Sequence, residues 1–186
     1  MAKVFTEITR LSDKDCFYIV ERHKTEFTYP LHLLNEFELN FIQNGKLVRG
    51  IVGGIVEEIG DYELVLVGGE ELEHVWEQGS CQSKDIREIT IQFSGDIFGN
   101  ELLSKNQFAS IQRMLRRAEH GLSFPLSTIM KVYSILDDIA HDKERFVQFL
   151  KSLYILYELS VSEDARVPAS SSFAHSPRKV ESRRVE

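Results

Sequence analysis

The stretch FELNFI, residues 37–42, decides how the first half of this chain folds. Phe37, Leu39 and Phe41 occupy every second position, and polar residues such as Glu38 stand between them. A period of two is expected of a β-strand that buries one face and turns the other away from the core. We therefore predict a strand whose polar face looks onto solvent or onto a cavity.

Similar short apolar runs recur between glycine turns up to about residue 100. Six or more short strands within about 80 residues are typical of a sandwich or a small barrel. The other runs are CFYIVE (16–21), KLVRGIVGGIVEEIG (46–60), ELVLV (63–67) and IREITIQF (86–93).

Beyond that point the apolar spacing lengthens to that of amphipathic helices. The pattern predicts three of them, within 106–121 and over 127–140 and 145–160, with Gly121 as a C-terminal stop for the first. We therefore divide the chain into a β-barrel over 1–98 and a helical region over 99–160.

The tail, residues 161–186, is rich in serine and charge and poor in apolar side chains. Such a composition cannot bury much apolar surface, and it is typical of linkers and disordered ends. We expect it to lead toward a further domain that this sequence does not contain.

Composition limits the possible classes of function. The chain has 186 residues and a net charge of -7, with 42% hydrophobic and 27% charged residues. This balance gives no basic face for nucleic acid, and no apolar run reaches the roughly 18 residues of a membrane span. The N-terminus lacks a signal-peptide core, and we interpret Cys16 and Cys81 as buried free thiols, so a cytoplasmic location is expected.

Polar residues near the predicted strands are candidates for a binding site. His32 and Glu38 flank the start of one strand, and His74 and Trp76 are spaced to share the face of another. Imidazole and indole on one face suit a pocket for a polar, partly cyclic molecule. Glu36 joins them only if its strand begins early; the alternative for all five is a place at the rim or on the surface.

These residues resemble the cupin motifs. His32, Glu38 and Gly45 match the first motif, and Gly60, Gly68 and His74 match the second loosely. The whole run from PLHLLNEFELNFIQNG to LEHVWEQ looks more closely like the sensor domain of AraC-type bacterial transcription regulators, particularly those of Bacteroidetes. The resemblance implies a mainly β, cupin-like jelly-roll barrel followed by about three dimerisation helices, and it covers most of the chain.

Two departures from the family pattern bear on metal binding. The first motif has a second histidine where this chain has Leu34, and the second motif usually has a proline that is absent here. A metal needs three or four converging ligands, so we expect neither a metal nor another cofactor.

The resemblance implies an effector-sensing domain that binds a small organic molecule, such as a sugar or another metabolite. His32, Glu36, Glu38, His74 and Trp76 are the expected ligand-binding residues. The effector would favour one arrangement of barrel, helices and linker. DNA would be bound only through the absent C-terminal domain, and no membrane partner is expected.

A homodimer is expected from the last predicted helix, which is apolar on more than one side. One side would pack within the chain and the other against a second copy; alternatively the barrel takes the second side. The residues assigned to dimerisation are Phe146, Phe149, Leu150, Leu153, Leu156 and Tyr157.

Two other classes of function remain open from the sequence. A small cupin enzyme, such as a metal-dependent dioxygenase or a sugar isomerase, needs an intact ligand set or an acid and base across a pocket. A purely structural dimerisation module needs no functional pocket. We expect no enzyme activity, because Leu34 interrupts the ligand set.

Overall fold

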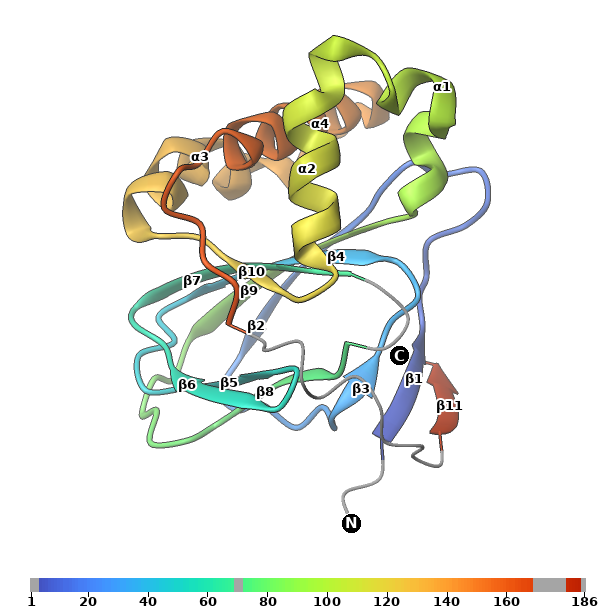
Figure 1. The fold of residues 1–186 in the computed structure, drawn as a ribbon. Helices are drawn as coiled ribbons and strands as arrows, with labels where there is room; N and C mark the ends of the chain where they lie inside the picture. The colour runs from blue at the N-terminus through green and yellow to red at the C-terminus, as the bar shows by residue number, and fades with distance from the viewer. Residues whose placement is uncertain (1–3, 69–71, 169–179, 185–186) are drawn as a thin grey trace.

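Two facing β-sheets with helices packed over one of them form the fold (Figure 1). The structure is a computed structural model that describes residues 4–68, 72–168 and 180–184. The six-stranded sheet has the order β11 (Val180–Arg184), β1 (Val4–Ile8), β3 (His32–Leu33), β8 (His74–Glu77), β5 (Arg49–Val52) and β6 (Ile55–Glu58). The five-stranded sheet has the order β10 (Leu122–Ser123), β7 (Tyr62–Val67), β4 (Phe37–Gln43), β9 (Ile86–Phe93) and β2 (Tyr18–Lys24).

The helices follow the strands in the chain. The 3-10 turns η1 (Gly95–Phe98) and η2 (Asn106–Phe108) flank a short α1 (Gly99–Leu103), which the sequence pattern did not predict. The three predicted helices are α2 (Ala109–Ala118), α3 (Leu126–Ile139) and α4 (Arg145–Ser160). Gly121 has the positive φ of 76° expected of a residue that ends a helix.

This arrangement confirms the predicted fold class: mainly β, cupin-like, with C-terminal helices. The barrel is not closed by hydrogen bonds, because within the described ranges the strands of one sheet pair only with strands of the same sheet. No helix in those ranges is both long enough and apolar enough to span a bilayer.

The five-stranded sheet is buried on both faces. Leu39 and Phe41 of β4, together with Ile89 and Ile91 of β9, belong to one apolar core with the helices. The opposite face of the same strands looks at the six-stranded sheet. The predicted alternation in residues 37–42 is therefore confirmed, and its polar side faces the space between the sheets.

The space between the sheets is apolar in one part only. A second core fills that part with Ile42, Val65, Trp76 and neighbouring side chains. Polar residues occupy the remainder, and they line the cavity described below.

One expectation, that both cysteines are buried, needs correction. Cys81 is buried, but Cys16 is exposed, because it lies in the loop before β2. In the tail, Arg166 pairs with Ser123 and with Glu57, and Val180–Arg184 forms β11, parallel to β1. Residues 169–179 of the expected linker lie outside the described residues.

Candidate functional site

Strand register brings two histidines together. His32 of β3 stands directly opposite His74 of the antiparallel strand β8, so their side chains share the inner face of the six-stranded sheet. The ring centroids are 4.3 Å apart, and both residues are buried. A two-residue strand is therefore enough to place one imidazole against the other.

Glu38 approaches this pair from the facing sheet. Its Oε1 lies 3.6 Å from His74 Nε2, and its side chain is 5% exposed. One ligand atom from each of His32, Glu38 and His74 lies within 4.8 Å of the others. Three of the predicted site residues thus converge, although they come from three strands and two sheets.

Backbone carbonyls orient both imidazoles. His32 Nδ1 lies 2.9 Å from the oxygen of Pro30, and His74 Nδ1 lies 3.3 Å from that of Leu72. A carbonyl oxygen only accepts, so each Nδ1 holds the proton and each Nε2 is directed at the cluster. His74 Nε2 is buried and has no hydrogen-bond partner.

Glu7 is a further member that the sequence interpretation missed. Phe5 stands beside His32 in the parallel pair of β1 and β3, so Glu7, two residues on, shares the inner face with His32. Its Oε2 lies 3.1 Å from His32 Nε2. The alternation in VFTEI, residues 4–8, was the only local signal for this strand.

Gln92 of β9 holds the two carboxylates side by side. Its Nε2 donates to Glu7 Oε1 at 3.1 Å and to Glu38 Oε2 at 2.8 Å. Its Oε1 accepts a hydrogen bond of 2.6 Å from the Thr9 hydroxyl, which fixes the orientation of the amide. One amide therefore bridges two buried acidic groups.

Burial and neighbouring groups shift the pKa values of the cluster residues in different directions. Burial and the nearby charge of Glu38 together raise the pKa of Glu7 to about 7. Burial alone would also raise the pKa of Glu38, but His74 and the hydrogen bond from Gln92 hold it below its usual value. Burial lowers the pKa of His32 to about 4, so this imidazole is neutral at pH 7.

Glu7, His32 and Glu38 of this cluster line one end of a cavity of about 320 Å³ between the sheets, and His74 is not among the lining residues. This volume lies within the range of small-molecule sites. Trp76 also lines the cavity and meets His74 edge-on, with 5.7 Å between ring centroids. Glu36 is half-buried just before β4 and is not among the lining residues.

The other end of the cavity holds positive charge. Lys24 Nζ lies 2.6 Å from Glu88 Oε2, and Arg22 Nη1 lies 3.8 Å from the same oxygen. Between the two ends, Asn40 Nδ2 donates to Glu38 at 3.3 Å and to Glu88 at 3.5 Å. A bound molecule would meet carboxylates and imidazoles at one end and paired cations at the other.

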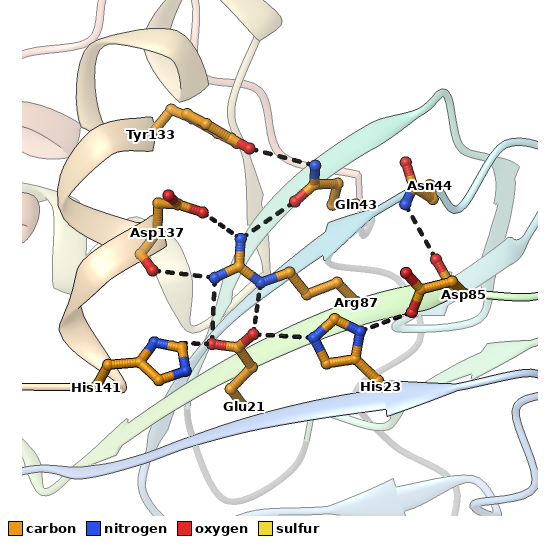
Figure 2. A network of polar contacts seen from close by, with 9 residues as sticks. All are labelled: Glu21, His23, Gln43, Asn44, Asp85, Arg87, Tyr133, Asp137 and His141. Atoms are coloured by element: carbon orange, nitrogen blue, oxygen red, sulfur yellow. Dashed lines mark hydrogen bonds and ion pairs between the residues drawn. The ribbon is translucent and has the colours of Figure 1, made fainter.

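A second polar network lies on the helix-facing side of the same strands (Figure 2). Arg87 of β9 donates two hydrogen bonds to Glu21 of β2, at 2.7 and 3.1 Å, and it also donates to Asp137 of α3. His23 lies 3.0 Å and His141 3.6 Å from Glu21. Burial would raise the pKa of Glu21, but Arg87 and His23 hold it below its usual value.

The donor set of the His–Glu cluster suits a divalent metal ion. Imidazole nitrogens and carboxylate oxygens are common ligands of first-row metals, and one ligand atom from each of the three residues lies within 4.8 Å of the others. His32, Glu38 and His74 are the residues that would hold such an ion. The expected absence of a metal rested on Leu34. This side chain is buried and does not line the cavity.

The six residues assigned to dimerisation do not form one surface. Phe146, Leu150 and Tyr157 are exposed by 70%, 49% and 45%. Leu156 is 2% exposed and belongs to the core beneath the helices, so it does not lie on the surface of the chain. Phe149 and Leu153 are half-buried. The exposed apolar residues along α4 are Phe146, Val147, Leu150, Tyr154 and Tyr157, and we call them the α4 outer face.

The fold and the cavity together define a cupin-like β-domain with a helical cap. No protein-family model matches the chain, and no curated protein matches it. Among solved structures it is similar to ToxT of Vibrio cholerae, an AraC-family regulator. A ligand-free variant of ToxT has a TM-score of 0.48 at 12% identity, over 81% of this chain and 55% of that chain.

Two ligand-bound ToxT structures are similar to the same degree. The one with an unsaturated fatty acid has a TM-score of 0.47 at 14% identity, over 90% of this chain and 60% of that one. The one with a methylnaphthyl butenoic acid has a TM-score of 0.49 at 12% identity, over 87% and 61%. This chain thus spans less than two thirds of the chains it matches.

Proposed function

We propose that this chain is the effector-sensing and dimerisation part of an AraC-type transcription regulator, and that it binds a small polar organic molecule between its two sheets. The observation that carries the proposal is the cavity of about 320 Å³ lined by His32, Glu38 and Trp76. Hydrogen-bonding groups at both ends and an indole wall suit a molecule with hydroxyl, amine or carboxylate groups on a compact ring.

Signal transfer would follow the strands that separate the cavity from the helices. Along β9, Glu88, Thr90 and Gln92 line the cavity, whereas Ile89, Ile91 and Arg87 contact the helical side. An effector that binds one arrangement of β9 better than another would thereby shift the position of α3. The Arg87 network is the polar part of this connection.

The α4 outer face supports the dimerisation part of the proposal. Several large apolar side chains stand in solvent along one side of a helix whose other side is in the core. A contiguous apolar surface of this kind is typical of a protein contact. A second copy of the chain is the partner that the family resemblance implies, and DNA binding would belong to a separate domain.

A thermal-stability screen of the chain against sugars, amino acids and small organic acids tests the effector proposal. A ligand that binds only the folded state raises Tm with its concentration. We expect at least one compound class to raise Tm in the wild type but not after His32→Ala or Trp76→Ala. If no class raises Tm at millimolar concentration, the chain is not an effector sensor of this kind.

A small cupin enzyme is the second candidate, because the donors of His32, Glu38 and His74 converge within 4.8 Å. A metal-dependent enzyme converts the bound compound into a product, whereas a sensor releases the compound unchanged. Mass spectrometry of the stabilising compound after long incubation separates the two classes.

A further inference from the structure

We propose that the effector of this cavity is a compact organic cation, an amine on a small apolar or aromatic body, whose ammonium group binds beside Glu7 and Glu38. This ligand class rests on the proposed function, because it concerns the same cavity between the sheets. Three features of the lining support it: the balance of charge, the hydrogen-bond acceptors at one end and the aromatic side chains beside them.

Acidic side chains outnumber basic ones in the lining of the cavity. The charged lining residues are Glu7, Glu26, Glu38, Glu88, Arg22 and Lys24. Both basic side chains contact Glu88, since Lys24 Nζ lies 2.6 Å and Arg22 Nη1 3.8 Å from its Oε2. Because Glu88 compensates these cations, a positively charged ligand would lower the electrostatic cost of the two carboxyl groups at the opposite end.

Amide groups hold Glu7 and Glu38 side by side. Gln92 Nε2 donates to Glu7 at 3.1 Å and to Glu38 at 2.8 Å, and Asn40 Nδ2 donates to Glu38 at 3.3 Å. An amide carries no charge, so it binds a carboxylate without neutralising it. An ammonium group brings a full positive charge and three N–H donors, and it would therefore favour the ionised form of both carboxyl groups.

Asn40 supplies a further acceptor at this end. It lines the cavity and is 3% exposed, and within the described ranges its Oδ1 has no hydrogen-bond partner. A buried acceptor without a donor is unfavourable, so a ligand that brings N–H groups can gain a hydrogen bond that the free protein lacks. A carboxylate ligand offers no donor, and it would repel Glu38.

Aromatic rings stand beside the same carboxyl groups. Trp76 and Tyr29 both line the cavity, as does Phe27. Trp76 meets His74 edge-on with 5.7 Å between centroids, and Tyr29 meets His32 edge-on at 4.7 Å. Aromatic faces attract organic cations and also pack against their apolar part. A sugar would gain from the rings but would bring no charge to the carboxylates, so the lining favours an amine.

Titration of the 186-residue chain with benzylamine, benzyl alcohol and benzoate tests the proposal, because the three compounds share a ring and differ in charge at neutral pH. Trp76 is the only tryptophan in the sequence, so its fluorescence reports binding in the cavity. EDTA is present throughout, so that an amine cannot bind through a metal ion. We expect benzylamine to bind about 10-fold or more tightly than benzyl alcohol, and benzoate to bind least tightly.

Two variants separate recognition of charge from general fit. Glu38→Gln and Glu7→Gln each remove one carboxylate but keep a side chain of the same size. Each should reduce the preference for benzylamine over benzyl alcohol by about 3-fold or more, while benzyl alcohol binds as it does to the wild type. Glu101→Gln makes the same exchange at a 92%-exposed position on α1, and it should leave all three affinities within about 2-fold.

Three outcomes would overturn the proposal: wild-type protein that binds benzyl alcohol or benzoate as tightly as benzylamine, a preference for the amine that is unchanged in both variants, or no change in Trp76 fluorescence with any of the three compounds at millimolar concentration. In each case, a sugar or an acid that raises Tm in the stability screen would leave the proposed function standing. If no compound raises Tm, amines included, the proposed function fails as well.

Discussion

Arg87 of β9 donates to both the side chain and the backbone carbonyl of Asp137 near the end of α3, and it holds Glu21 of β2 with the rest of its guanidinium (Figure 2). One side chain therefore ties two strands of the cavity wall to a helix of the cap. The side chains of Arg87 and Glu21 are only 11% and 12% exposed. A charge pair in this position cannot lose one partner without leaving the other poorly solvated.

Replacement of Arg87 by alanine is expected to lower the free energy of unfolding by about 3 kcal/mol, because Glu21, whose side chain is 12% exposed, is left without its main partner. Arg49→Ala is the matched control, since Arg49 and Glu77 are 48% and 42% exposed, and such surface pairs contribute about 1 kcal/mol or less. Urea denaturation of both variants measures the difference. Equal losses of unfolding free energy in the two variants would mean that the Arg87 network stabilises the fold no more than a surface ion pair does.

Two leucines of α4, less than two turns apart, are expected to respond differently to truncation. Leu156→Ala removes a 2%-exposed core side chain and should cost about 2–5 kcal/mol. Leu150 is 49% exposed, so Leu150→Ala should change the stability of the monomer by about 0.5 kcal/mol or less. Denaturation at low protein concentration, where a dimer contributes least, provides the measurement.

A charge on the α4 outer face should break the proposed dimer without unfolding the chain. Leu150→Glu places a carboxylate among Phe146, Tyr154 and Tyr157, where a second copy would have to desolvate it. We expect sedimentation to shift from dimer to monomer at micromolar concentration while the circular dichroism stays unchanged. Lys143→Glu, at an exposed position before α4, is the control and should leave the dimer intact. A wild-type chain that sediments only as a monomer contradicts the proposal.

The strands that the sequence pattern predicts most clearly are those whose two faces have different surroundings. β4 and β9 alternate because their two faces meet different surroundings, a helical core on one side and a polar cavity on the other. β3 has only two residues, and its place depends on register with His74, which no local pattern specifies. The candidate residues His32, Glu38 and His74 could be named from motif spacing, but their convergence follows from strand pairing across two sheets.

Glu7 shows why the rest of the site was not predicted. It reaches His32 only because β1 and β3 pair in parallel, and parallel neighbours are brought together by long connections rather than by a local turn. The helices show a similar limit. The apolar pattern of α4 indicated two buried sides, but it did not indicate that Leu156 faces the core while Leu150 faces outward.

Filling the cavity should abolish the response to an effector without unfolding the protein. Thr90 is buried at the middle of the lining, so Thr90→Trp would occupy much of the 320 Å³. We expect loss of ligand-induced stabilisation and a change in the stability of the free chain of about 1–3 kcal/mol or less. Thr25→Trp makes the same exchange at an exposed position and should respond like the wild type. A Thr90→Trp variant that still responds would place the effector elsewhere.

Glu63 should make the stability of the chain depend on pH between about 4.5 and 7. Burial raises the pKa of this carboxyl to about 7; Ser123, which donates to it at 3.0 Å, and Arg166 lower the pKa, and Glu57 raises it. Because the folded-state pKa lies above the unfolded value, the folded state binds the proton more tightly. The resulting stability is complete below pH 4.5 and is lost as pH rises through 7. Relative to Glu63→Gln, which cannot ionise, the wild type should lose about 1–3 kcal/mol of unfolding free energy between pH 5 and pH 8. Urea denaturation of the two proteins at several pH values measures this difference, and parallel pH profiles would show that Glu63 does not keep its proton in the folded chain.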